Sequence, residues 1–307
     1  MPCTPAIATM SVGRAWVHPL PAKLPQIAAT GFQGIELFYE DLESLAREHS
    51  ASPGAEPSEP SLLAAAQTTK TLCAALDLQS ISLQPFLFYE GLLDRAAHAQ
   101  RLTQLRTWFR LAHTLGTDLI QIPSTFLPST ETTGNLGVII ADMVELAELG
   151  LRESPVIRFA YENLAWGTHV ATWEALWAVG ERCGRADPEA IAGRVEGEGN
   201  ADAVLAESLA RLVRTVDGRK VFYVQVVDAE RLAAPRGEGH PFYVEGQPAR
   251  MSWSRNARLF LYEQERGGYL PVVAVARAFV KELKFEGWVS MELFARSLAE
   301  ADPGLGL

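Results

Sequence analysis

The chain is poor in the residues on which several functional classes depend. Three of its 307 residues are cysteines, far apart and without a CxxC pair, so neither a disulfide framework nor a thiolate zinc site is indicated. Asp and Glu number 37 against 27 Lys and Arg, a formal net charge of −10, which leaves no positive field for a nucleic-acid backbone. We therefore expect a cytoplasmic protein without a nucleic-acid partner.

Membrane and nucleotide signatures are missing as well. No apolar run is as long as a bilayer span, and the first residues show no basic stretch followed by a long apolar one. We therefore expect neither a membrane segment nor a leader. No GxSxG, Walker or dinucleotide-binding glycine pattern follows a β-rich run, which argues against serine-nucleophile, nucleotide and hydride chemistry.

Short β-rich runs alternate with helical patterns along the chain, which is typical of βα units around a parallel sheet. The expected strands are 6–10, 34–39, 80–86, 118–123, 156–162, 221–228 and 288–294. The expected helices are 59–77, 94–115, 133–150, 169–182, 201–217 and 271–284. Because α/β barrels often reach this length as one unit, we predict a single TIM (β/α)8 barrel domain over residues 1–307.

One strand is missing from this pattern. A closed parallel barrel needs eight strands, each followed by a helix. Residues 183–200, CGRADPEAIAGRVEGEGN, contain no run that alternates or stays apolar for the length of a strand, and their Gly, Pro, Glu and Asp favour a loop. We predict a barrel that lacks one internal strand around 183–190.

Three expected strands each carry one polar side chain among apolar neighbours: Glu162 in VIRFAYENL, Gln225 in VFYVQVVDAE and Glu292 in WVSMELF. Burying a carboxylate in such surroundings is costly unless a cation or a donor compensates it. Oxygen ligands suit Mg²⁺ or Mn²⁺ better than Zn²⁺, so we predict one shared divalent metal site inside the barrel. The alternative is structural, with the carboxylates on backbone amides or an arginine and Gln225 as a satisfied core amide.

Polar residues near other strand ends are candidates for catalysis or substrate binding. His169, seven residues after Glu162 and predicted at the start of a helix, is a candidate general acid or base, although a helix-start or surface histidine fits the same pattern. Gln84 ends a strand before Pro85 and is predicted to face the barrel mouth and the substrate. Glu36 is a further inward candidate, but alternation does not say which face it takes.

The stretch 229–270 is predicted to be a long irregular insertion after a barrel strand, the place where active sites of TIM barrels are built. It contains His240, a second acid or base candidate, and Arg250, Ser254 and Arg255 as candidate substrate-binding residues. Two arginines there would clamp a carboxylate, whereas loop arginines also commonly make surface ion pairs.

Several segments carry a resemblance to a known family. They are GFQGIELFYEDL (31–42), LQPF (83–86), GLLDR (91–95), LIQIP (119–123), KVFYVQVVDAE (220–230), PARMSWSRNARLF (248–260) and GWVSMELF (287–294). Together they closely resemble the fungal 3-dehydroshikimate dehydratases of quinate catabolism, which belong to the xylose-isomerase-like TIM-barrel superfamily. The resemblance covers most of the chain, and the PARMSWSRNARLF motif is specific.

The resemblance implies a divalent metal held by Glu, Asp, Gln and Glu from the ends of consecutive strands. Glu162 matches the first ligand, Gln225 the third and Glu292 the fourth. The second, an Asp in a strand ending with an LDTF-type motif, has no match, and RADPEAIAGR (185–194) resembles the segment just beyond it. Strand and ligand are missing together, which we interpret as a gene-model or splicing change. Family members also continue past ELF into a further helix, so the last helix is expected to be missing here.

The sequence leaves three functions open, and a small molecule is the expected substrate. The resemblance implies loss of water from 3-dehydroshikimate to give protocatechuate, with His169 or His240 as acid or base, and with Arg255 and Arg250 on the carboxylate. The second is an inactive or metal-free pseudoenzyme, or a truncated gene model of this family, since loss of a charged ligand weakens binding of a hard cation. The third is a sugar isomerase or epimerase of the same superfamily. The sequence carries no expectation for oligomeric state.

Overall fold

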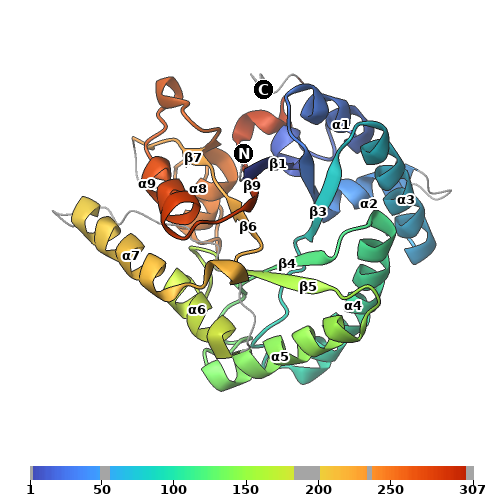
Figure 1. Ribbon diagram of the computed structural model, residues 1–307, viewed down its shortest axis with the longest axis horizontal. Coiled ribbons are helices and arrows are strands. Elements are labelled where there is room, and N and C mark those ends of the chain that lie inside the picture. Colours follow the sequence, from blue (N-terminus) through green and yellow to red (C-terminus); the bar gives the residue numbers. More distant parts are fainter. Residues whose placement is uncertain (1–2, 49–55, 183–200, 234–236, 302–307) are drawn as a thin grey trace.

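The computed structural model describes residues 3–48, 56–182, 201–233 and 237–301 (Figure 1). Its centre is a parallel sheet in the order β5-β4-β3-β2-β1-β9-β6, with helices around the outside (Figure 1). The strands are β1 (Cys3–Ala8), β2 (Gly34–Phe38), β3 (Gln79–Gln84), β4 (Leu119–Pro123), β5 (Arg158–Glu162), β6 (Tyr223–Gln225) and β9 (Gly287–Met291). Each expected strand is present, which confirms the predicted TIM-barrel class.

The expected helices also form, with shifted ends. They are α3 (Glu59–Ala75), α4 (Arg95–Leu115), α5 (Leu136–Arg152), α6 (Trp173–Arg182), α7 (Ala201–Thr215) and α9 (Val272–Arg277), which continues as the π-helix η4 (Ala278–Glu282). The start of α4 is fixed by Asp94, whose side chain accepts hydrogen bonds from the backbone N–H groups of Ala96 and Ala97. None of the helices in the described parts of the chain is long and apolar enough to cross a membrane.

Three further helices were not predicted. They are α1 (Leu20–Ala29), α2 (Tyr39–Glu48) and α8 (Ala249–Ala257). The prediction that 229–270 is wholly irregular is therefore wrong, since α8 lies inside it next to the antiparallel pair β7 (Asp228–Ala229) and β8 (Arg258–Leu259). Several strand ends were also predicted too long: β1 turns into the 3-10 helix η1 (Thr9–Val12), β3 stops at Gln84, β6 at Gln225 and β9 at Met291.

The sheet has two outer edges, on β5 and on β6. No strand in the described ranges pairs with either edge. The strand predicted to be missing around 183–190 would fall between β5 and β6 in chain order, and that segment lies outside the described residues. After β9 the described chain contains the short helix η5 (Arg296–Ala299) and ends at Ala301, so the expected lack of a last helix stays a prediction.

Alternate strand positions face the helices or the barrel interior. Outward side chains such as Ile35, Leu83 and Ile120 belong to the main hydrophobic core that the sheet shares with its surrounding helices. Inward side chains near the N-terminal ends of the strands form a small apolar layer: Ala6, Ile81, Leu119, Ala160 and Tyr223. Toward the C-terminal ends of the strands the inward positions become polar, and the candidate site lies there.

Candidate active site

A layer of polar side chains crosses the barrel interior. Gln225 on β6 donates a hydrogen bond from Nε2 to Oε2 of Glu36 on β2 over 2.5 Å. Because β1 and β9 separate these two strands in the sheet, the contact has to pass through the concave interior. We call the following residues the polar layer: Glu36, Ser82, Gln84, Gln121, Glu162, Gln225, Ser290 and Glu292.

Glu36 is the centre of the hydrogen bonds in the polar layer. Its side chain is fully buried. Besides Gln225, the Nε2 of Gln84 donates to its Oε2 at 2.9 Å, and the hydroxyl of Ser290 donates to its Oε1. Burial raises the pKa of Glu36 and the charge of Glu292 raises it further, while hydrogen bonds from Ser290, Gln225 and Tyr223 lower it. The side chain of Glu36 therefore faces the barrel interior, which answers the question that strand alternation left open.

Glu292 lies immediately after β9, beside an arginine that sequence reasoning missed. Burial raises the pKa of Glu292, opposed by the charge of Arg258 and by a hydrogen bond with Gln84. Arg258 is itself buried; its Nη1 donates to the backbone oxygen of Glu292 at 3.4 Å and its Nε donates to Oγ of Ser254 at 3.1 Å. The spacing of four between Ser254, in the last turn of α8, and Arg258, the residue after that helix, was the available signal.

Glu162 is the last residue of β5, at one edge of the sheet. It is buried, and its Oε2 accepts a hydrogen bond from Nε2 of Gln121 on the neighbouring strand β4 at 3.0 Å. The structure therefore joins Gln84 and Gln225 through Glu36 and joins Glu292 to this group through Gln84. Glu162 lies at the C-terminal end of the edge strand β5.

Glu90, in the loop after β3, is a buried acid that the sequence predictions did not include. Its Oε1 accepts hydrogen bonds from the backbone N–H of Thr125 at 2.6 Å and from the hydroxyl of Tyr161 at 3.0 Å. Burial raises the pKa of Glu90 to about 7. Glu90 thus joins the loop after β3 to the ends of β4 and β5. Its partner Tyr161 lies one residue before Glu162. Its position directly before the GLLDR segment was the nearest sequence signal.

The two predicted histidines lie on loops. His169 Nε2 is 3.1 Å from Oγ1 of Thr132. The predicted helix start at His169 is wrong, because the chain still turns there and α6 begins only at Trp173. His240 accepts a hydrogen bond at Nδ1 from the backbone N–H of Phe242 at 3.1 Å. Within the ranges that the structure describes, neither histidine makes a hydrogen bond with the polar layer.

The predicted arginines lie outside the polar layer. Arg250 donates from Nη1 to the backbone oxygen of Ala165 at 3.1 Å, so it ties α8 to the loop that follows β5. Arg255 is exposed, and its backbone oxygen accepts a hydrogen bond from Nη2 of Arg14 at 3.2 Å. Arg258, three residues later, is the arginine that reaches Glu292.

The donor set of the polar layer suits a hard cation. Oε1 of Gln225 and Oε1 of Gln121 are buried and have no hydrogen-bond partner among the described residues. Buried polar atoms are rarely left without a partner. An amide oxygen with no partner on Gln225, together with the buried carboxylates of Glu162 and Glu292, provides the ligand types that Mg²⁺ and Mn²⁺ prefer.

A second group of possible metal ligands lies between two helices. In the described part of the chain, one set of His, Cys, Asp and Glu has three ligand atoms within 4.8 Å of one another: His98 on α4 with Asp142 and Glu145 on α5. Asp142 already accepts hydrogen bonds from the backbone N–H of Gly91 at 2.8 Å and from Nη2 of Arg95 at 2.8 Å. Since Arg95 supplies the positive charge, this group is a polar contact that links α4 and α5.

The parallel strands, their surrounding helices and the polar interior define a TIM barrel of the kind that carries its chemistry at the C-terminal ends of its strands. A family model described as "Xylose isomerase-like TIM barrel" matches residues 24–306. The chain belongs to this family.

Two 3-dehydroshikimate dehydratases are similar to this chain in sequence. A 3-dehydroshikimate dehydratase of Neurospora crassa is 46% identical over 324 aligned residues, which cover 99% of this chain and 89% of the relative. That alignment is 17 positions longer than this chain of 307, so the relative has residues that this chain lacks. A protein of the same name from Pseudomonas aeruginosa is 29% identical over 94% of this chain, which spans 38% of that longer relative.

A solved structure supports the fold. It is described as a xylose isomerase-like TIM barrel/4-hydroxyphenylpyruvate dioxygenase fusion protein, is 25% identical, and superimposes with a TM-score of 0.69. The match covers 95% of this chain and 39% of that one.

Proposed function

We propose that the protein is a cytoplasmic 3-dehydroshikimate dehydratase of quinate catabolism, which removes water from 3-dehydroshikimate to give protocatechuate with the help of Mg²⁺ or Mn²⁺. The 46% identity to the Neurospora crassa enzyme over 99% of the chain carries this proposal. The buried oxygen donors at the C-terminal ends of the strands support it, because TIM-barrel active sites lie at that end.

Glu162, Gln225 and Glu292 would hold the cation. When bound, a divalent cation would polarise the substrate ketone and stabilise the negative charge that develops on its oxygen. Glu36 orients Gln225, since it accepts the amide hydrogen at Nε2 and so leaves Oε1 for a ligand. The second ligand that the family resemblance implies belongs to the strand predicted to be missing.

The remaining residues would bind substrate and move the proton. Arg258, buried beside Glu292, and the rim residues Arg250 and Arg255 would attract the substrate carboxylate. His169 or His240 would take the proton next to the ketone. Gln84 and Ser254 would position their neighbours, since Gln84 donates to Glu36 and Ser254 accepts from Arg258.

The test is an assay of the purified protein with 3-dehydroshikimate and either Mg²⁺, Mn²⁺ or a chelator, in which the aromatic product is followed by ultraviolet absorbance and identified by chromatography. We expect protocatechuate with metal and none with chelator. A folded protein that gives no product with any divalent metal would contradict the proposal and favour a pseudoenzyme. Aldose–ketose conversion without protocatechuate would favour a sugar isomerase.

A further inference from the structure

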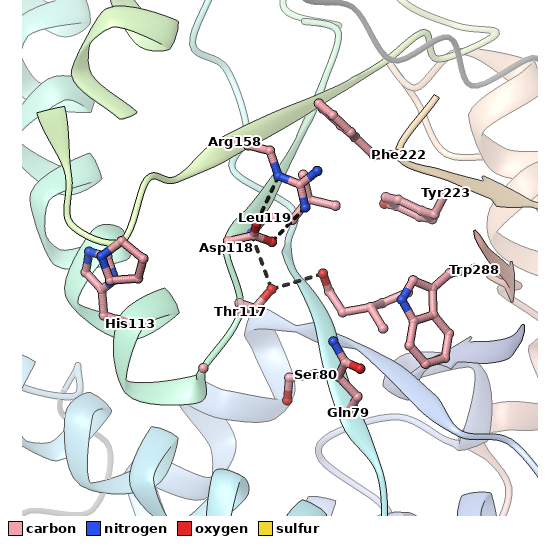
Figure 2. Close-up of a pocket in the computed structure, with 13 residues that line it drawn as sticks. Gln79, Ser80, His113, Thr117, Asp118, Leu119, Arg158, Phe222, Tyr223 and Trp288 are labelled. Carbon is pink, nitrogen blue, oxygen red and sulfur yellow. Dashed lines mark hydrogen bonds and ion pairs between the residues drawn. The ribbon is translucent and has the colours of Figure 1, made fainter. Parts of the chain in front are cut away.

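A separate cavity lies at the other end of the barrel from the polar layer. Its volume is about 420 Å³, within the range of small-molecule pockets. The first residues of several strands line it, among them Gln79 of β3, Leu119 of β4, Arg158 of β5 and Tyr223 of β6 (Figure 2). Because these strands are parallel, the cavity opens at their N-terminal ends, away from Glu162, Gln225 and Glu292. We call it the lower cavity.

One wall of the lower cavity is aromatic. Phe222 and Tyr223 lie on one side of it with Trp288 of β9 (Figure 2). The ring of Trp288 packs directly on the backbone of β2, since a Cβ added to Gly34 would lie 2.7 Å from its Cζ3 atom. The glycine therefore fixes where this ring lies, and the aromatic wall is formed before any ligand arrives.

The opposite wall is polar and already ordered. Arg158 donates to Asp118 from Nε at 2.9 Å and from Nη2 at 2.8 Å, a two-bond arrangement that fixes both groups. The guanidinium carbon also lies 4.7 Å from the ring centroid of Phe222, so it joins the polar wall to the aromatic wall. Thr117 donates from Oγ1 to the backbone oxygen of Ile81 at 3.0 Å. Figure 2 shows these bonds along one side of the cavity.

The charges on these walls select for a neutral occupant. The positive charge of Arg158 is balanced by Asp118 at hydrogen-bond distance, so neither an anion nor a cation gains a free counter-charge there. The carboxylate and hydroxyl oxygens of Asp118 and Thr117 remain able to accept hydrogen bonds from a ligand hydroxyl. The flat rings opposite favour a planar, apolar face on the same molecule.

The two edges of the described sheet border this space. TIM-barrel interiors are normally filled by layers of side chains. Here Arg158 on β5 and Phe222 just before β6 line the cavity. β5 and β6 are the two edge strands of the sheet, and no described strand lies between them. The apolar layer containing Ile81, Leu119 and Tyr223 borders the cavity.

We propose that the lower cavity binds a neutral, planar aromatic compound with hydroxyl groups, about the size of two fused rings. Its rings stack on the Trp288 and Phe222 wall, and its hydroxyl groups donate to the Asp118 side. This site uses none of the residues of the polar layer, so its test does not depend on whether the proposed dehydratase activity is found.

Isothermal titration of the full chain with a dihydroxynaphthalene, in the presence of EDTA so that no bound metal chelates the diol, tests this proposal. We expect saturable binding with one site, weakened about tenfold or more by Trp288→Leu and by Phe222→Leu, because each variant removes an aromatic contact. A fully saturated diol of the same ring size and a naphthoate should each bind about tenfold more weakly than the neutral aromatic diol.

Two control variants locate the binding. Trp16→Leu removes an exposed tryptophan that does not line the lower cavity, and Glu292→Gln changes the polar layer. Both variants should leave the affinity unchanged. Absence of saturable binding, or equal affinity in wild type and Phe222→Leu, overturns the proposal. Loss of binding in Glu292→Gln also overturns it, because the ligand would then occupy the polar layer. If circular dichroism shows that Trp288→Leu does not fold, the affinity of Phe222→Leu, a change at a partly exposed position, decides the result.

Discussion

Gln225 and Glu36 meet across the barrel at 2.5 Å, although two strands separate their own strands in the sheet. The bond uses the amide hydrogen of Gln225 and leaves its buried Oε1 without a partner among the described residues. Gln225 thus makes a structural contact through Nε2 and keeps Oε1 available for a ligand.

Replacement of Gln225 by leucine should therefore weaken metal binding. We expect the affinity for Mn²⁺ to fall about tenfold or more in Gln225→Leu, since a ligand oxygen and its orienting bond are lost together. Isothermal titration with Mn²⁺ measures this. Asp142→Asn, in the helix-to-helix group of α4 and α5, is the control and should leave the affinity unchanged; if it abolishes binding instead, the metal lies between those helices.

Arg258 should matter more than Arg255 for both activity and stability. Arg258→Met leaves the buried Glu292 without its neighbouring positive charge, which costs on the order of 3 kcal/mol in unfolding free energy for a buried pair, and we expect KM for the substrate to rise about tenfold or more. Arg255→Met removes an exposed charge and should change unfolding free energy by less than about 1 kcal/mol. Urea unfolding and steady-state kinetics compare the two variants. The reverse ranking would support Arg255 as the main carboxylate-binding residue.

Glu90 should make stability fall as pH rises. Its pKa is about 7 in the folded protein against an ordinary value of 4.5. Between these values the folded protein holds a proton that the unfolded chain has released, so the free energy of unfolding decreases with rising pH. The full effect is on the order of 3 kcal/mol. Urea unfolding at about pH 5 and about pH 8 should show a smaller decrease for Glu90→Gln than for wild type; equal slopes would mean that Glu90 is ionised at neutral pH.

Gly34→Ala should destabilise the protein. The added methyl group would lie 2.7 Å from Cζ3 of Trp288 and 2.8 Å from Cγ2 of Ile81, so a buried ring or a strand side chain has to move, at a cost of about 1–3 kcal/mol. Gly237→Ala is the matched control, because nothing lies within 4 Å of its added Cβ. Urea midpoints of the two variants test this, and a stable Gly34→Ala protein would show that the Trp288 ring is not fixed by this contact.

Sequence patterns predicted the strands well because the side chains along each strand alternate between the hydrophobic core under the helices and the barrel interior. The same alternation placed Glu162, Gln225 and Glu292 on strands but left the face of Glu36 open. The bond between Glu36 and Gln225 joins residues 189 positions apart, and such a pairing follows from the curvature of the sheet rather than from any local pattern. Only the three-dimensional sheet order reveals it.

Helices were harder to predict where local signals conflicted. α1 contains Pro25 inside its length, a residue that normally breaks a helix interior. α8 carries Arg, Ser and Asn on a short segment, and these residues predict a loop as readily as a helix. Missing α8 also hid Arg258, since Arg258 directly follows the helix that carries Ser254.

The two edges of the described sheet would give the proposed metal site a structural role as well. Glu162 ends the strand at one edge and Gln225 ends the strand at the other. A cation held by both would connect the two ends of the sheet through its coordination bonds, where the described backbone makes no such connection. Metal binding would then stabilise the folded protein by mass action, and it would tie together the two edges of the described sheet.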